Sequence, residues 1–244
     1  MTTKPFKIPK TAEAGAWLST PLSDSSNFGT LADHFPEPFA AYARVFHPAR
    51  KMGGVGKQGV RWQAVAEASD TKAHRLMQWP NISKVDAHAT RPIRADAPWM
   101  QIPTEGNLPS DVAAILASIL HQFTATPESC WFAVWDGHGF DDKPWMQAAP
   151  TVNINGQGYR LFTGPVETAT ESFYDFPDLP YSANMWWPDD HAWLVVTHID
   201  LQSTYIGGSD AAIEAILDES QLETFQAFID DDDTLGSDLI NLAD

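Results

Sequence analysis

The chain has 244 residues, of which 43% are hydrophobic and ten are tryptophan, and its formal net charge at pH 7 is −17. It has no run of about 18 apolar residues, which argues against a membrane span. Its single cysteine, Cys130, excludes an intramolecular disulfide and a cysteine-rich zinc site. The acidity argues against nucleic-acid binding, because the phosphates would be repelled.

The charge is unevenly distributed along the chain. Residues 161–244 carry 18 acidic side chains and no Lys or Arg, whereas residues 50–94 carry nine basic side chains against three acidic ones. An acidic half of this kind attracts basic partners over long distances. Alternatively, the charge serves solubility, or the acidic half folds onto the basic segment.

The first half of the chain contains few predicted regular elements. Residues 1–36 are polar, have no apolar signal-peptide core and are expected to form a loosely packed N-terminal arm. Ala40–His47 alternates aromatic and polar side chains, which predicts a strand. The basic segment 48–107 is expected to be irregular apart from a short helix at Val60–Ala68.

The middle of the chain gives clearer patterns. Apolar residues recur at helical spacing through Leu108–Phe123 and predict an amphipathic helix. Cys130–Asp136 is short, apolar and rich in strand-forming residues, which favours a central strand. In Thr151–Thr163, the pair Asn155-Gly156 predicts a tight hairpin, because both residue types adopt positive φ angles.

The last third begins with a turn at Pro188–Asp190, followed by a predicted strand at His191–Asp200. Ser209 is expected to cap a helix that starts directly after it. The spacing in Ser220–Glu223 is that of a capping box and predicts a further short helix. The acidic run Asp230–Asp233 is typical of a solvated loop.

Together these patterns predict an α+β fold with a mostly antiparallel sheet and flanking helices, in a single globular domain spanning residues 1–244. The composition favours a cytoplasmic location. The sequence gives no indication of a bound cofactor, because the common motifs for nucleotides and metals are absent.

A first candidate site lies at the end of the predicted central strand. Asp136 and His138, flanked by glycines, can act as an acid/base pair on a strand-end loop. The alternative is that Asp136-Gly137 is simply a turn.

A second candidate site is the binding surface Trp186, Trp187, Asp189 and Asp190. Paired aromatic rings beside paired carboxylates can hold a cation or a basic side chain of a partner. The alternative is that one tryptophan fills the core and the aspartates only turn the chain. No histidine lies at a spacing typical of metal ligands, so no metal site is predicted.

The segments CWFAVWDGHG, GYRLFTGP and MWWPDDHAWLVVTHIDLQSTYIGGS resemble an uncharacterised actinobacterial protein family. The resemblance covers roughly the half from Leu108 onward, with Tyr42–Pro48 as an outlying piece. It implies one coherent domain in a bacterial cytoplasm and implies no activity.

Three hypotheses follow for function. The first is a non-enzymatic acidic module that binds a basic protein or peptide through the Trp186–Asp190 surface. The second is a hydrolase or metal-assisted enzyme that uses Asp136, His138 and the pair Asp189-Asp190, which requires these loops to converge on one pocket. The third is a structural element that buries exposed tryptophans at a self-interface.

Overall fold

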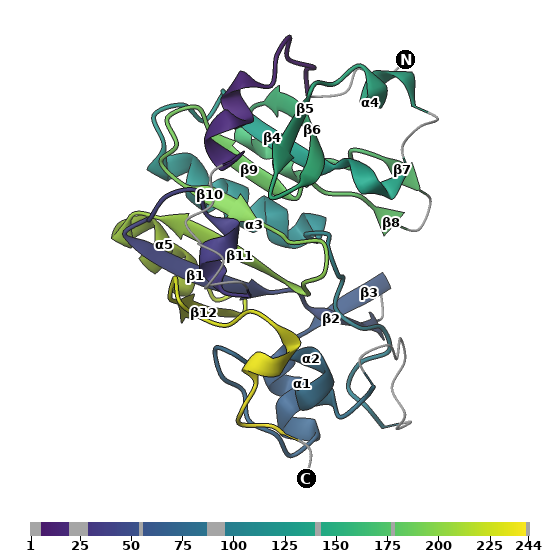
Figure 1. Cartoon of the computed structure of the whole chain (residues 1–244). Helices are drawn as coiled ribbons and strands as arrows, with labels where there is room; N and C mark the ends of the chain where they lie inside the picture. Colours follow the sequence, from purple (N-terminus) through teal and green to yellow (C-terminus); the bar gives the residue numbers. More distant parts are fainter. Residues whose placement is uncertain are drawn as a thin grey trace.

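The computed structural model describes residues 6–19, 29–53, 56–86, 96–139, 143–176 and 179–242. Its centre is an eight-stranded sheet with the order β12-β1-β11-β10-β9-β4-β6-β5, in which every neighbouring pair is antiparallel (Figure 1). The strands of this sheet are β1 (Ala41–Phe46), β4 (Cys130–Trp135), β5 (Thr151–Ile154), β6 (Gln157–Gly164), β9 (Met185–Pro188), β10 (Leu194–Val196), β11 (Ser203–Gly208) and β12 (Thr224–Ala227). Two small ribbons lie outside it, β2 (Ala49–Gly53) with β3 (Gly56–Val60) and β7 (Asp175–Phe176) with β8 (Leu179–Pro180).

Short helices surround the sheet, so the predicted α+β fold with a mostly antiparallel sheet and flanking helices is confirmed. The α-helices are α1 (Trp62–Ala68), α2 (Trp79–Ser83), α3 (Ser110–Leu120), α4 (Pro144–Gln147) and α5 (Asp210–Leu217). The 3-10 turns are η1 (Glu13–Ser19), η2 (Leu31–His34), η3 (His121–Phe123), η4 (Asp136–His138), η5 (Val166–Thr170) and η6 (Leu235–Ser237). Among the described residues, no helix is long and apolar enough to cross a bilayer.

The two faces of the sheet bury different side chains, because successive residues of a strand point to opposite faces. On β10, Val195 packs into the cluster that contains α3 and α5, whereas Leu194 and Val196 pack into the cluster beneath η1 and η2. The sheet is therefore covered on both faces, by longer helices on one and by the N-terminal turns on the other.

A third cluster lies beyond one end of β1. It contains Phe46 at the end of that strand together with Trp62, Trp79 and Trp99, whose rings meet edge to face or at a tilt. The segment 48–107 builds most of this cluster through the β2–β3 ribbon, α1 and α2, at the bottom of Figure 1.

Several local predictions agree with the structure because short-range chemistry decides them. The Asn155-Gly156 turn has φ angles of 51° and 81° and joins β5 to β6. Ser209 caps α5, since its side chain accepts a hydrogen bond from the backbone N–H of Ala212. β4 lies between β9 and β6 in the middle of the sheet.

Other local predictions are wrong because tertiary pairing overrides them. Met185–Pro188, expected partly as a turn, is the strand β9 and pairs with β4 and β10. The strand predicted at His191–Asp200 shrinks to Leu194–Val196, and His191 adopts a left-handed φ of 54°. The glycine-rich Ser203–Gly208, for which no strand was predicted, is β11, which pairs with β1 and β10.

Glu223 does not begin a helix as expected, because the residues that follow it form β12. Its carboxylate instead accepts hydrogen bonds from the backbone N–H groups of Trp62 and Gln63, at 2.5 and 2.7 Å. These are two of the unpaired amides at the start of α1. The acidic residue caps a helix 160 residues away in the sequence rather than its own.

The acidic run Asp230–Asp233 is not the solvated loop that we expected. Asp231 and Asp233 are buried, with 6% and 7% exposure. Asp231 pairs with Arg75, and the following Asp238 accepts a hydrogen bond from His74 at 2.8 Å. This part of the acidic half is therefore packed against basic side chains of the segment 48–107.

Candidate functional site

The two tryptophans of the predicted binding surface are buried and face opposite sides of the sheet. Trp186 is 1% exposed and meets the ring of Trp193 edge to face at 5.2 Å. Trp187 is 0% exposed and meets Trp17 at 6.1 Å on the other face. Neither ring is available to a partner, so the prediction of an aromatic binding surface here is wrong, and so is the premise of a self-interface formed by these two residues. They lie in a strand, where adjacent side chains diverge.

The aspartates beside them are exposed, but their carboxylates accept hydrogen bonds that stabilise the local turn. Asp189 accepts a hydrogen bond from the indole N–H of Trp131 at 3.0 Å. Asp190 accepts from the hydroxyl of Thr124 at 2.8 Å and from the backbone N–H of Ala125 at 2.7 Å. Its partial burial raises the pKa of Asp190, but these hydrogen bonds outweigh burial and lower the pKa below its usual value.

Asp136 and His138 lie in η4, immediately after β4. Arg160 lies near Asp136, with its Nε 3.8 Å from the carboxylate. His138 packs its ring against Trp135 and Tyr181, at centroid distances of 4.8 and 4.2 Å, and burial lowers its pKa.

The two predicted sites do not converge. The backbone N–H of Asp189 donates to the carbonyl oxygen of Ser129, the residue before β4. Asp136, in contrast, follows the other end of that strand. Ser129 and Asp136 are seven residue steps apart along an extended chain, which corresponds to about 23 Å. The hydrolase hypothesis that joins Asp136 and His138 to Asp189 and Asp190 therefore lacks the geometry it needs.

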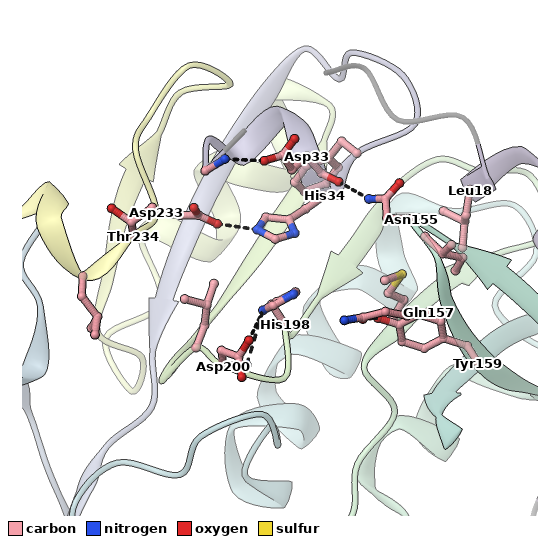
Figure 2. Close-up of a pocket in the computed structure, with 16 residues that line it drawn as sticks. Leu18, Asp33, His34, Asn155, Gln157, Tyr159, His198, Asp200, Asp233 and Thr234 are labelled. Carbon is pink, nitrogen blue, oxygen red and sulfur yellow. Dashed lines mark hydrogen bonds and ion pairs between the residues drawn. The ribbon is translucent and has the colours of Figure 1, made fainter. Parts of the chain in front are cut away.

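The structure gathers a different set of polar side chains around a pocket of about 650 Å³ on the face beneath η1 and η2. η2, the β5–β6 hairpin, the β10–β11 connection and the segment after β12 all contribute to its wall (Figure 2). The polar or titratable lining residues are Asp33, His34, Asn155, Gln157, Tyr159, His198, Asp200, Asp233 and Thr234. The other lining residues are mostly apolar, and we call them the apolar floor of the pocket.

Backbone pairing brings two segments far apart in the sequence, residues 29–31 and 231–233, together at this pocket. Thr30 forms a bridge with Asp232, and Leu31 donates its N–H to the carbonyl of Asp231 at 2.9 Å. Gly29 makes the approach possible, because a Cβ on it would lie 2.9 Å from the Thr234 side chain and its φ is +88°. The contact places the carboxylate of Asp233 against the imidazole of His34.

His34 and Asp233 form a shielded pair. Their side chains are 10% and 9% exposed, and Nε2 of His34 faces the carboxylate oxygen Oδ2. Burial would raise the pKa of Asp233, but the hydrogen bond from His34 and the nearby charges of His34, His198 and Arg44 lower it below its usual value. The carboxylate is therefore ionised and accepts the Nε2–H of His34.

His198 lies beside His34, with ring centroids 5.1 Å apart. The backbone N–H of Asp200 donates to Nδ1 of His198 at 3.3 Å, and the Asp200 carboxylate is 3.9 Å from the same atom. Burial, and secondarily the charge of His34, lowers the pKa of His198, which favours the neutral ring. A neutral ring that accepts at Nδ1 carries its proton on Nε2.

The same reasoning gives the opposite tautomer for His34. Because Nε2 donates to Asp233, a neutral His34 has its lone pair on Nδ1, an atom that makes no hydrogen bond within the described part of the chain. Figure 2 shows the free nitrogen of each ring on the side that faces Gln157. The pocket thus presents one imidazole acceptor and one imidazole donor next to each other.

Gln157 forms part of the opposite wall. The hydroxyl of Tyr159 donates to its amide oxygen at 2.8 Å, which leaves the amide NH2 group directed into the pocket (Figure 2). Burial, with the charges of Asp200 and Asp136, raises the pKa of Tyr159, so the phenol keeps its proton.

The pocket has an acidic character. Asp33, Asp200 and Asp233 line it, and none of the described lining residues is Lys or Arg. The Asp200 side chain is 77% exposed, whereas Asp33 accepts a hydrogen bond from the N–H of Gly29 at 2.6 Å. Within the residues that the structure describes, no group of three or more His, Cys, Asp or Glu side chains is arranged to hold a metal ion.

Sequence reasoning missed this site because its members are far apart in the chain. His34 and Asp233 are separated by 199 positions, and neither belongs to a motif. His198 and Asp200 were assigned to a strand, although they lie in the turn after β10. The usable signal was the charge pattern, since Asp233 belongs to a run of four aspartates.

Comparison of the chain with protein-family models, with curated proteins and with solved structures finds no match. The resemblance to an actinobacterial family therefore stays a prediction. The geometry of the pocket is therefore the best indication of function.

Proposed function

We propose that the protein is an acidic binding module whose pocket holds the basic end of an amphipathic ligand. The ligand class is a primary amine or guanidinium on an apolar stem, either as a small molecule or as a basic side chain of a peptide. The observation that supports this most directly is the lining of the pocket, with three aspartates and no Lys or Arg among its described residues, above an apolar floor.

Charge favours a cation over an anion. The lining contains three carboxylate side chains and, among its described residues, no Lys or Arg, and residues 161–244 carry 18 acidic side chains and no Lys or Arg. Such a surface raises the local concentration of cations and speeds their encounter. The exposed carboxylate of Asp200 is the group best placed to meet an ammonium at the rim, because the carboxylate of Asp233 is already shared with His34.

The apolar floor sets the shape of the ligand. Leu18, Ile154, Met185 and Leu201 line the pocket together with the polar residues. Apolar stems bury favourably against such a floor, with about 25 cal/mol for each Å² removed from water. A volume of about 650 Å³ is in the range of ordinary small-ligand sites.

Calorimetric titration with n-hexylamine, hexan-1-ol and hexanoate tests the proposal, because these probes share a stem and differ in charge. We expect hexylamine to bind most tightly and hexanoate not to bind, with affinity falling as salt screens the charges. Equal affinity for hexylamine and hexanoate would overturn the proposal. Titration with Nα-acetyl-lysine methylamide and with a lysine-containing pentapeptide distinguishes a free amine from a peptide side chain as the source.

A pair of charge-matched variants locates the site. Asp200→Asn should weaken hexylamine binding roughly two- to fivefold, the range expected for an exposed ion pair. Asp218→Asn removes the same charge from an exposed residue at the end of α5, on the other face of the sheet, and should leave the affinity unchanged. Equal effects of the two substitutions would mean that the general charge of the protein, and not the pocket, attracts the amine.

A further inference from the structure

The pocket contains hydrogen-bonding groups that the binding of a cation alone does not require. It holds a hydrogen-bond acceptor, Nδ1 of His34, and two hydrogen-bond donors, Nε2–H of His198 and the NH2 group of Gln157, which face a common space (Figure 2). A basic side chain has no acceptor for these two donors. The arrangement therefore calls for a ligand that combines a cationic end with a carbonyl group.

We propose that the pocket hydrolyses a small carboxylic ester that carries a cationic amine, with His34 as the general base. This inference rests on the proposed function, because it takes the amine to be held at the acidic rim. The three groups needed for attack by water on a carbonyl are a base, a partner that orients the base, and donors for the developing oxyanion.

His34 is the base and Asp233 its positioning partner. The carboxylate fixes the ring with Nδ1 free, and it stabilises the imidazolium that forms when Nδ1 takes a proton. The pair is about nine-tenths shielded from water, which strengthens this electrostatic support relative to an exposed pair.

His198 and Gln157 are the oxyanion donors. The neutral form of His198 donates through Nε2 because the Asp200 backbone N–H occupies Nδ1. The amide of Gln157 is oriented by the hydroxyl of Tyr159, which occupies its oxygen. Both donors are thus fixed before a substrate arrives, which is the condition under which such groups lower a barrier.

The reaction balances with one proton moving through His34. Water attacks the ester carbon, its proton passes to Nδ1 of His34, and the carbonyl oxygen becomes an oxyanion held by His198 and Gln157. The oxyanion then collapses, the bond from carbon to the alcohol oxygen breaks, and that oxygen takes the proton back from Nδ1. The products are the carboxylic acid and the alcohol, and the imidazole returns to its neutral form.

The test uses the full-length protein with the 4-nitrophenyl and methyl esters of 6-aminohexanoic acid, and 6-aminohexanamide as the binding probe. We expect hydrolysis above the buffer rate for both esters, and slower hydrolysis in D2O because a proton moves in the rate-limiting step. 4-Nitrophenyl hexanoate, which lacks the amine, should be a poorer substrate.

The variants separate the roles of the groups. His34→Gln should lower kcat/KM by about 100-fold or more, and the loss should be larger for the methyl ester, whose leaving group needs the returned proton. Gln157→Leu and His198→Phe should each lower kcat by about 100-fold, and His198→Gln, which restores an N–H donor, should recover part of the loss. His121→Gln changes a more exposed imidazole outside the pocket and should have no effect, which controls for simple imidazole catalysis of activated esters.

The outcomes distinguish the two proposals. If 6-aminohexanamide binds and neither ester is hydrolysed, the hydrolase inference is overturned and the binding proposal stands. If the amide does not bind, the binding proposal fails as well. If His34→Gln, Gln157→Leu and His198→Phe proteins with native circular dichroism hydrolyse the esters at the original rate, the assignment of the base and donors is overturned.

Discussion

Gly207 and Gly208 are neighbours in β11, but only at the first would an added Cβ be crowded by neighbouring atoms. A Cβ on Gly207 would stand 2.6 Å from Cδ2 of Phe39 and 2.8 Å from Cε1 of Phe35, whereas a Cβ on Gly208 would meet nothing closer than 3.5 Å. Phe35 is fully buried and lines the pocket. A glycine is required at position 207 so that η2 can pack closely against the sheet.

We therefore expect Gly207→Ala to destabilise the protein by about 1 to 3 kcal/mol, the usual cost of overpacking a dense core. Gly208→Ala, one residue further on, should change the free energy of unfolding by less than about 0.5 kcal/mol, because its surroundings accept a methyl group. Urea denaturation of the two variants measures both values. Equal losses would show that the strand, and not the contact with the phenylalanines, resists the change.

At the scale of elements, α1 depends on a residue outside its own sequence. Its preceding residue, Arg61, provides no side-chain cap, and Glu223 supplies the acceptor from the connection before β12. The arrangement ties the third hydrophobic cluster to the edge of the main sheet. Loss of the carboxylate would leave two amides at the helix start without a partner.

Glu223→Ala is expected to destabilise the protein by about 1 to 2 kcal/mol, as for other lost helix caps. Glu214→Ala removes the same side chain from an exposed position in α5 and should have little effect. Thermal unfolding measured side by side gives the comparison. A loss for Glu214→Ala as large as that for Glu223→Ala would contradict the capping role.

Elements that depend on neighbouring residues could be predicted from the sequence, whereas elements that depend on distant residues could not. The Asn155-Gly156 hairpin, the Ser209 cap and the stripe of α3 could be predicted because neighbouring residues determine them. Strands β9 and β11 could not, because their conformation is stabilised by pairing with distant strands and they contain turn-forming Pro or Gly. The pocket could not be predicted for the same reason.

At the scale of the whole molecule, a buried histidine links stability to pH. His47 is 0% exposed, and its ring contacts the carbonyl of Thr104 at 2.6 Å and the hydroxyl of Thr204 at 2.8 Å. Burial, aided by the charges of Arg44 and Arg50, lowers the pKa of His47 to about 4, although the Thr104 carbonyl acts in the opposite direction. The neutral ring therefore suits the folded state.

Between pH 6.5 and about 4 the unfolded chain binds a proton at His47 that the folded protein does not. Stability from this group is thus fully present above pH 6.5 and falls as the pH is lowered through this window, by up to roughly 3 kcal/mol. His47→Gln should flatten the fall, and His121→Gln, at a largely exposed site, should not. Urea denaturation at several pH values measures the slopes, and identical slopes for His47→Gln and the original protein would refute the assignment.

The pairing of His34 with Asp233 also means that the pocket can form only late in synthesis on the ribosome. These residues are 199 positions apart. At 5 to 20 residues per second, His34 is synthesised about 10 to 40 s before Asp233. During most of this interval β1 has no partner strand, because its two neighbours in the sheet, β11 and β12, have not yet been synthesised. A nascent chain halted before residue 203 would expose an unpaired strand and lack Asp233, Thr234 and Leu235 of the pocket lining, which makes late synthesis the period in which this protein most needs protection from aggregation.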